Sequence, residues 1–294
     1  MWSKIYHIYV LFYRKVLIAC HLIKVYDKSM EEFLHFLQGE MEVPRIISWF
    51  HFLMLVPIIA LTFLITFFFR NSTEKTYKRI LLIHWIILLI LETFKQIIKA
   101  FHYGDPSYWE YSIRDFPFSI CSMVYYFIPI ILFVNKEKHP KIIDAANGYL
   151  CFISLVSGIA VCIYTDMVMS NLIFINVQSL IHHGAQVILG VYIYVWNRKT
   201  ISIKTVYRSL IAFVITAAIA IIINLCFYPN FINMFFINPT RITNLPIGSI
   251  VQEKAGYPVY LMAFLTFIGL VTLLMYFIET SIYKLIIRKK KAAE

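Results

Sequence analysis

The chain contains several long apolar runs in which polar and apolar residues do not alternate. Backbone groups in hydrocarbon must be hydrogen-bonded within the spanning structure, so only helices and closed barrels cross a bilayer. Because barrel strands alternate apolar and polar residues, these runs predict transmembrane helices. Composition agrees: 60% of the 294 residues are hydrophobic and 15% are charged, whereas about a quarter are charged in a typical soluble domain.

Seven runs reach the length of about 20 residues that a spanning helix needs. They cover residues 46–69, 80–102, 116–134, 142–164, 171–196, 206–227 and 258–283. Every second loop is basic, and the positive-inside rule places those loops in the cytoplasm. The sequence thus predicts an all-α, multi-pass protein of the cell membrane, with Lys75, Lys138, Lys199 and Lys289 cytoplasmic and Asp105, Asp166 and Glu253 external. The C-terminus is predicted to be cytoplasmic.

Residues 1–28 are apolar but carry basic residues on one helical face. An arc of about 120° holds Lys4, His7, Arg14, Lys15 and His21. This pattern is typical of an amphipathic helix in the membrane interface, and an eighth span with a cytoplasmic N-terminus is the alternative. The rest of the chain is predicted to form a seven-helix membrane domain, 29–287, and a basic cytoplasmic tail, 288–294.

The loop at 228–256 is long and apolar. Its Pro239, Pro246 and Gly248 prevent one continuous helix. Irregular backbone at membrane depth is tolerated where it is buried in protein. We therefore expect this loop to pack back on the bundle as a lid or a re-entrant segment.

The formal charge of +11 does not indicate nucleic-acid binding, because the basic residues form short clusters between apolar runs. The five cysteines lie in hydrophobic stretches without the paired spacing of a zinc site or a disulfide scaffold. They are Cys20, Cys121, Cys151, Cys162 and Cys226. The sequence therefore predicts no metal and no cofactor, and it does not indicate an oligomeric state.

Ionisable residues inside a span are costly, and each is a functional-site hypothesis by default. In the second predicted span Glu92, Lys95, Gln96 and Lys99 share one helical face. One interpretation is an internal ion pair that fixes helix packing. The other is a lysine that binds a lipid phosphate near the outer leaflet. Residue types alone leave both interpretations open.

Four short segments, in order, resemble the transmembrane protein 164 family, which includes the bacterial YwaF-type proteins. The segments cover residues 116–121, 176–184, 233–239 and 257–260. The position of His51 and the pattern of Glu92, Lys95 and Gln96 resemble the bacterial branch in particular. The resemblance extends from about residue 46 to residue 283, and residues 1–28 lie outside it.

The resemblance implies an integral membrane acyltransferase that moves fatty acyl groups onto lysophospholipids with a cysteine and a histidine. Residue by residue, these are Cys121 and His183. The implied partner is a membrane phospholipid or lysophospholipid. His183 would remove the thiol proton, and the thiolate would attack an acyl ester. Candidates for contacting the substrate are His51, Glu92, Lys95, Gln178, His182 and Asn233, of which Gln178 and Asn233 could stabilise an oxyanion.

The sequence places Cys121 and His183 at different depths in the membrane. Counted from the external boundary at 1.5 Å per residue, Cys121 lies about 7 Å and His183 about 18 Å into the membrane. Different helix starts or tilts would close that gap. We expect the reactive atoms within about 4–6 Å of each other, beneath the 228–256 loop.

Three other functions are weighed against this one. A transporter is an alternative because membrane histidines and Glu92 could line a pathway, although no internal inverted repeat supports it. A membrane lipid hydrolase is a second alternative, with water replacing the acceptor. A retinal photoreceptor is excluded, because a Schiff base needs a lysine in the last span and 258–283 contains none.

Overall fold

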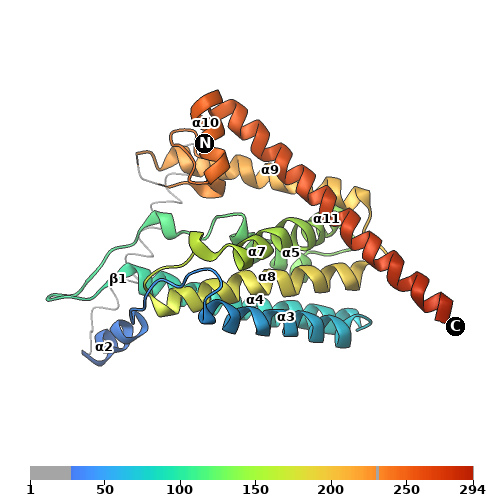
Figure 1. Cartoon of the computed structure of the whole chain (residues 1–294), viewed down its shortest axis with the longest axis horizontal. Coiled ribbons are helices and arrows are strands. Elements are labelled where there is room, and N and C mark those ends of the chain that lie inside the picture. The colour runs from blue at the N-terminus through green and yellow to red at the C-terminus, as the bar shows by residue number, and fades with distance from the viewer. Residues whose placement is uncertain (1–27, 230–231, 294) are drawn as a thin grey trace.

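The computed structural model is nearly all helical and describes residues 28–229 and 232–293. Most long helices run along one common direction, and α11 crosses them diagonally (Figure 1). In the described part of the chain, five helical segments are long and apolar enough to span a membrane. They are α3 (Trp49–Phe69), α4 (Glu74–Ala100), the joined segment Pro140–Ile163, α9 (Ile203–Cys226) and α11 (Tyr257–Ala293). The protein is therefore a polytopic, all-α membrane protein.

Two predicted spans have a different form. Residues 116–134 give only a short apolar helix, in which the 3-10 turn η2 (Cys121–Met123) leads into α5 (Val124–Phe133). Residues 116–120 enter the bundle in an irregular conformation, since Pro117 disfavours helix at the residue before it. The fifth predicted span is α8 (Ile173–Asn197), which is long enough to cross but carries a cluster of polar side chains between Asn176 and Gln186. The count of seven spans stays a prediction.

The fourth predicted span is one continuous helix with a widened centre. It consists of α6 (Pro140–Gly148), the π-helical turn η3 (Tyr149–Ser154) and α7 (Leu155–Ile163). Single π turns inside α-helices frequently lie at functional sites. At the chain end, α11 continues through the predicted tail, 288–294, as far as Ala293. Residues 288–293 of that segment are therefore helical.

The central helix of the bundle is α8. Most of its residues are buried, because α3, α4 and α7 pack around it. Close approach depends on glycines: a Cβ at Gly184 would lie 2.5 Å from Ile58 on α3, and one at Gly158 on α7 would lie 2.8 Å from the carbonyl oxygen of His183. The polar face of α8 is thus held in tight contact with its neighbours.

Three of the basic loops meet at one end of the bundle. The Tyr77 hydroxyl donates to Asn147 Oδ1 at 2.9 Å and accepts from Asn197 Nδ2 at 3.3 Å, which joins α4, α6 and α8. The Trp196 ring stacks on Tyr77 with centroids 4.0 Å apart. This grouping agrees with the predicted topology. The assignment of this end to the cytoplasm stays a prediction.

The opposite end carries α2 (Lys28–Leu37), the antiparallel pair β1 (Phe101–His102) and β2 (Tyr108–Trp109), and the short turns η1 (Ile113–Asp115) and η4 (Thr165–Met167). After α2, the Gln38 amide donates to the carbonyl oxygens of Ile98 at 2.9 Å and Phe101 at 2.6 Å. The amphipathic helix or eighth span predicted for residues 1–28 lies outside the described residues, except for Lys28.

The 228–256 loop packs back on the bundle as predicted. It contains the turn η5 (Met234–Phe236) and the helix α10 (Pro246–Ala255). The side-chain amide of Asn224 on α9 donates to the Met234 carbonyl at 3.0 Å and accepts from its N–H at 2.8 Å. The buried Phe235 ring lies 5.8 Å from that of Phe118, three residues before Cys121. The loop therefore covers the chain that leads to Cys121.

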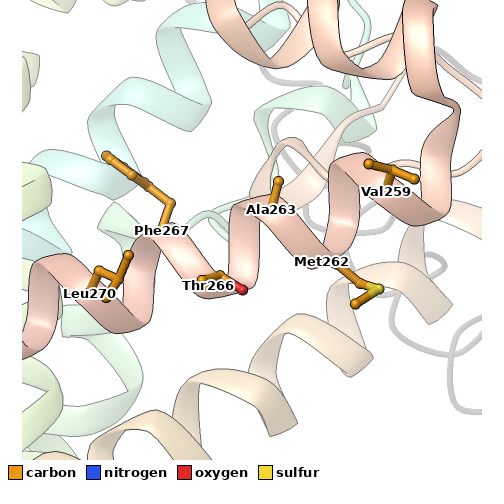
Figure 2. Close-up of a pocket in the computed structure, with 6 residues that line it drawn as sticks. All are labelled: Val259, Met262, Ala263, Thr266, Phe267 and Leu270. Carbon is orange, nitrogen blue, oxygen red and sulfur yellow. The ribbon is translucent and has the colours of Figure 1, made fainter.

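A shallow apolar hollow of about 530 Å³ lies along α11 (Figure 2). Its lining comes from this helix alone and consists of Val259, Met262, Ala263, Thr266, Phe267 and Leu270. Figure 2 shows these side chains spread along one stretch of the helix. None of the candidate site residues lines the hollow, so it is separate from the polar interior of the bundle.

Candidate functional site

The candidate site lies along α8, where polar side chains are concentrated inside the bundle. Gln178, His182 and Gln186 follow one another at intervals of four residues and therefore share one face of the helix. Ser179 and His183 form a neighbouring stripe. All five are buried. Polar groups in such a place require partners from the surrounding helices or from a ligand.

His182 contacts the 3-10 turn η2 and the helix α5 that follows it. Its Nε2 lies 3.2 Å from the Cys121 carbonyl oxygen, and its Nδ1 lies 2.9 Å from the Tyr125 hydroxyl. A carbonyl only accepts, so Nε2 carries a proton. The irregular segment 116–120 brings Cys121 down to the level of His182, which resolves much of the depth difference calculated from the sequence.

The predicted ion pair between Glu92 and Lys95 is present, with Lys95 Nζ 2.7 Å from Glu92 Oε1. Gln96 Nε2 donates to the same oxygen at 2.6 Å, and the Tyr125 hydroxyl lies 3.1 Å from Oε2. Glu92 is 7% exposed. Three donors thus replace the water that a buried carboxylate would otherwise need.

Tyr125 connects this ion pair to His182. The hydroxyl has one proton and two close partners, Glu92 and His182. When it donates to Glu92, the second hydrogen bond requires a proton on His182 Nδ1. When it donates to His182, a hydrogen bond to Glu92 requires a protonated carboxyl group. The three side chains therefore form one connected proton network.

His183 has a different pattern of hydrogen bonds. Its Nδ1 lies 2.7 Å from the Ser179 carbonyl oxygen, which fixes the proton on Nδ1 and leaves a lone pair on Nε2. In the part of the chain that the structure describes, Nε2 makes no hydrogen bond. The ring is perpendicular to that of His182, with centroids 5.0 Å apart. A neutral imidazole in this tautomer is equipped to accept a proton.

The Cys121 thiol is free and faces Ser157 on α7 and Gln186 on α8. Among the residues described, neither His182 nor His183 makes a hydrogen bond to this thiol. The predicted separation of the reactive atoms of Cys121 and His183 therefore stays a prediction. The structure does bring Cys121 against α8, because His182 binds its carbonyl group.

Gln186 is held by two serines. Its Oε1 accepts from Ser154 Oγ at 3.3 Å and from Ser157 Oγ at 3.2 Å. Its Nε2 is buried and has no hydrogen-bond partner. Sequence reasoning missed Tyr125 and these three residues. The interval of four between His182 and Gln186 is the signal that could have identified the glutamine.

Other predicted residues have structural partners. His51 Nε2 lies 2.6 Å from the Cys162 carbonyl, and Nδ1 accepts from the Ile47 N–H at 3.2 Å, so both ring nitrogens link the start of α3 to the end of α7. Asn233 Oδ1 accepts from the Asn238 N–H at 2.9 Å within the 228–256 loop. Gln178 lies on α8 near His182. Within residues 28–229 and 232–293, no cluster of three metal-binding side chains occurs.

Comparison with known proteins identifies the family. A family model described as the TMEM164 family matches residues 46–276. No curated protein and no solved structure matches the chain. The matched region covers most of the sequence and includes every predicted site residue, from His51 to Asn233. The chain therefore belongs to the TMEM164 family.

Proposed function

We propose that the protein is an integral membrane acyltransferase that moves fatty acyl groups between phospholipids and lysophospholipids. Cys121 is the nucleophile and His183 is the general base. The observation that carries the proposal is the position of Cys121, whose thiol and carbonyl group both face buried polar side chains of α8. Polar groups are expensive in a membrane and are retained there chiefly for function.

The hydrogen bonds favour His183 over His182 as the base. Both ring nitrogens of His182 are engaged, one by the Cys121 carbonyl and one by Tyr125. Accepting the thiol proton would cost His182 one of these bonds. His183 uses only Nδ1, so Nε2 is available for proton transfer.

The reaction takes place in two acyl transfers. His183 accepts the thiol proton, and the Cys121 thiolate attacks the ester carbonyl carbon of a phospholipid. The tetrahedral intermediate expels the lysophospholipid alkoxide, which takes the proton from His183 and leaves a thioester on Cys121. His183 then takes the proton from the hydroxyl group of a second lysophospholipid as the hydroxyl oxygen attacks the thioester, and it passes that proton to the departing Cys121 thiolate.

Lys95 is the proposed contact for the lipid phosphate. Its side chain is 19% exposed, and one of its three N–H donors is committed to Glu92. Lys99, one turn further along α4, pairs with Asp115 on η1. A phosphate beside Lys95 would lie at the end of the bundle that carries η1, where segment 116–120 leads into the bundle toward Cys121. The lipid headgroup and the thiol would then occupy neighbouring positions.

The test is acyl transfer by purified protein in nanodiscs, from a fluorescent phosphatidylcholine to a lysophospholipid. Cys121→Ser and His183→Ala should each abolish turnover, and the double variant should be no worse, because the two residues act as a unit. His182→Ala should keep most activity. Cys162→Ser is the matched control, since it removes another buried thiol and should remain active.

Mass spectrometry should detect a thioester-linked acyl group on Cys121 when the acceptor is left out. A fully active Cys121→Ala variant would refute the proposal. Release of free fatty acid at the same rate with and without the lysophospholipid would instead identify a lipid hydrolase, with water as the acceptor.

A further inference from the structure

The side chain of Gln186 combines two properties that rarely occur together. It is 1% exposed, and its Nε2 has no hydrogen-bond partner. An unsatisfied buried donor costs about 1–3 kcal/mol, so such groups in a native protein call for an explanation. The Gln186 side chain interacts with the thiol of Cys121, the proposed nucleophile. His182, one turn away on the same face of α8, lies 3.2 Å from the Cys121 carbonyl oxygen, so this face of α8 is directed at Cys121.

Two neighbouring serines contact the amide oxygen of Gln186. The hydroxyl protons of Ser154 and Ser157 both have Gln186 Oε1 within reach, and Ser157 has the Ser154 carbonyl at 3.0 Å as a second acceptor. The observed orientation therefore satisfies the hydroxyl groups and directs the NH₂ group away from them.

Packing holds Gln186 in place. A Cβ added to Gly158 would lie 2.9 Å from Gln186 Cβ, so the bare backbone of α7 presses against this residue. The π turn η3 ends at Ser154, so one of the two serines that hold the amide lies in the widened part of the helix and the other, Ser157, lies three residues later. The donor is thus preorganised and does not have to be ordered by a substrate.

We propose that Gln186 is a catalytic residue that stabilises the oxyanion of the acyl-transfer reaction. This inference rests on the proposed function. When the Cys121 thiolate forms its bond to the ester carbonyl carbon, the π electrons of the carbonyl group move to its oxygen. The Nε2–H groups of Gln186 donate hydrogen bonds to that oxygen until the C=O bond re-forms and the alkoxide leaves. Glutamine and asparagine amides serve this role in other oxyanion holes.

The two donors considered from the sequence are less suitable. Asn233 lies in the 228–256 loop, where its Oδ1 accepts from Asn238. Gln178 is two helical turns from Gln186 on α8, about 12 Å along the axis. Gln186 alone among the three interacts with the Cys121 thiol.

The experiment compares two reactions of the same thiol. Acylation by a fluorescent phosphatidylcholine passes through an oxyanion, whereas alkylation by iodoacetamide displaces iodide at a saturated carbon and forms none. Both are followed as mass increases on Cys121 under single-turnover conditions. Gln186→Met, which has similar volume and no donor, should slow acylation by about 10²- to 10³-fold. Its alkylation rate should stay within a few-fold of the unmodified protein.

Gln186→Leu provides a second variant if methionine disturbs folding. It removes the donor without adding a charge, so the same selective loss of acylation is expected. Equal acylation rates in Gln186→Leu and the unmodified protein would overturn the inference and leave the proposed function intact. Equal losses in acylation and alkylation would also overturn it, because Gln186 would then act on the thiol. If the unmodified protein forms no thioester on Cys121, the proposed function itself is wrong.

Discussion

The ion pair between Glu92 and Lys95 allows a quantitative test of how the bundle tolerates charge. The variants are Glu92→Leu, Lys95→Met and the double replacement. Lys95→Met leaves a carboxylate that is 7% exposed without its counter-charge. Glu92→Leu leaves an ammonium group on a side chain that is 19% exposed. The double variant removes both charges and keeps apolar volume in their place.

The expected magnitudes follow from the remaining partners. Removing one member of a buried pair costs about 3–5 kcal/mol when the other charge is left uncompensated. Gln96 and Tyr125 still donate to Glu92 in Lys95→Met, so we expect the lower limit, about 3 kcal/mol. Lys95 can extend toward the interface in Glu92→Leu, so about 2 kcal/mol is expected there. The double variant should lose less than about 1 kcal/mol, because apolar residues of similar volume often replace a buried pair without cost.

The assay is reversible unfolding in mixed detergent micelles, analysed as a double-mutant cycle. The matched control is the exposed pair of Glu74 and Lys78 on the same helix, with Nζ and Oε1 3.2 Å apart and side chains 52% and 39% exposed. That pair should show a coupling of about 0.3–0.5 kcal/mol. A coupling for Glu92 and Lys95 no larger than the control would refute the reasoning. A stable double variant without lipid binding would favour a headgroup role for Lys95.

Two further predictions concern topology and packing. Cysteines introduced at Lys138 and Glu253 should react with an impermeant reagent from opposite sides of the membrane, and labelling of position 138 from outside would reverse the proposed topology. Gly158→Ala should lower the free energy of unfolding by about 1–3 kcal/mol, because α7 would have to move away from the His183 carbonyl. Gly269→Ala, which meets nothing within 4 Å, should be neutral or slightly stabilising; equal melting temperatures for the two variants would contradict this account.

The fold was predictable where hydropathy alone decides structure. The bounds of α3 and α9 lie close to the predicted spans, because uninterrupted apolar runs have no alternative to helix in a bilayer. The third span was less predictable. Residues 116 through 134 are apolar throughout, but Pro117 and its neighbours keep the first part irregular. Hydropathy alone does not distinguish an apolar helix from an apolar irregular segment.

The site was predictable in residue types more than in contacts. The sequence placed Glu92 and Lys95 on one helical face, and the ion pair is present. The link from Glu92 through Tyr125 to His182 joins three different helices, so no spacing along the chain could have predicted it. The same holds for Gln186, whose serine partners come from η3 and α7.

The π turn η3 makes this helix tolerant of a lost residue at one place. A π turn holds about one more residue than an α-helical turn that covers the same rotation. Deleting a single residue between Tyr149 and Ile153 would therefore convert this segment to α-helix and keep Ser157 and Gly158 directed toward α8. The same deletion in α6 would rotate everything after it by about 100° and turn both residues away from α8. Insertion into the membrane thus depends on the hydropathy of this helix, whereas alignment of the thiol with its neighbours depends on where a residue is added or removed.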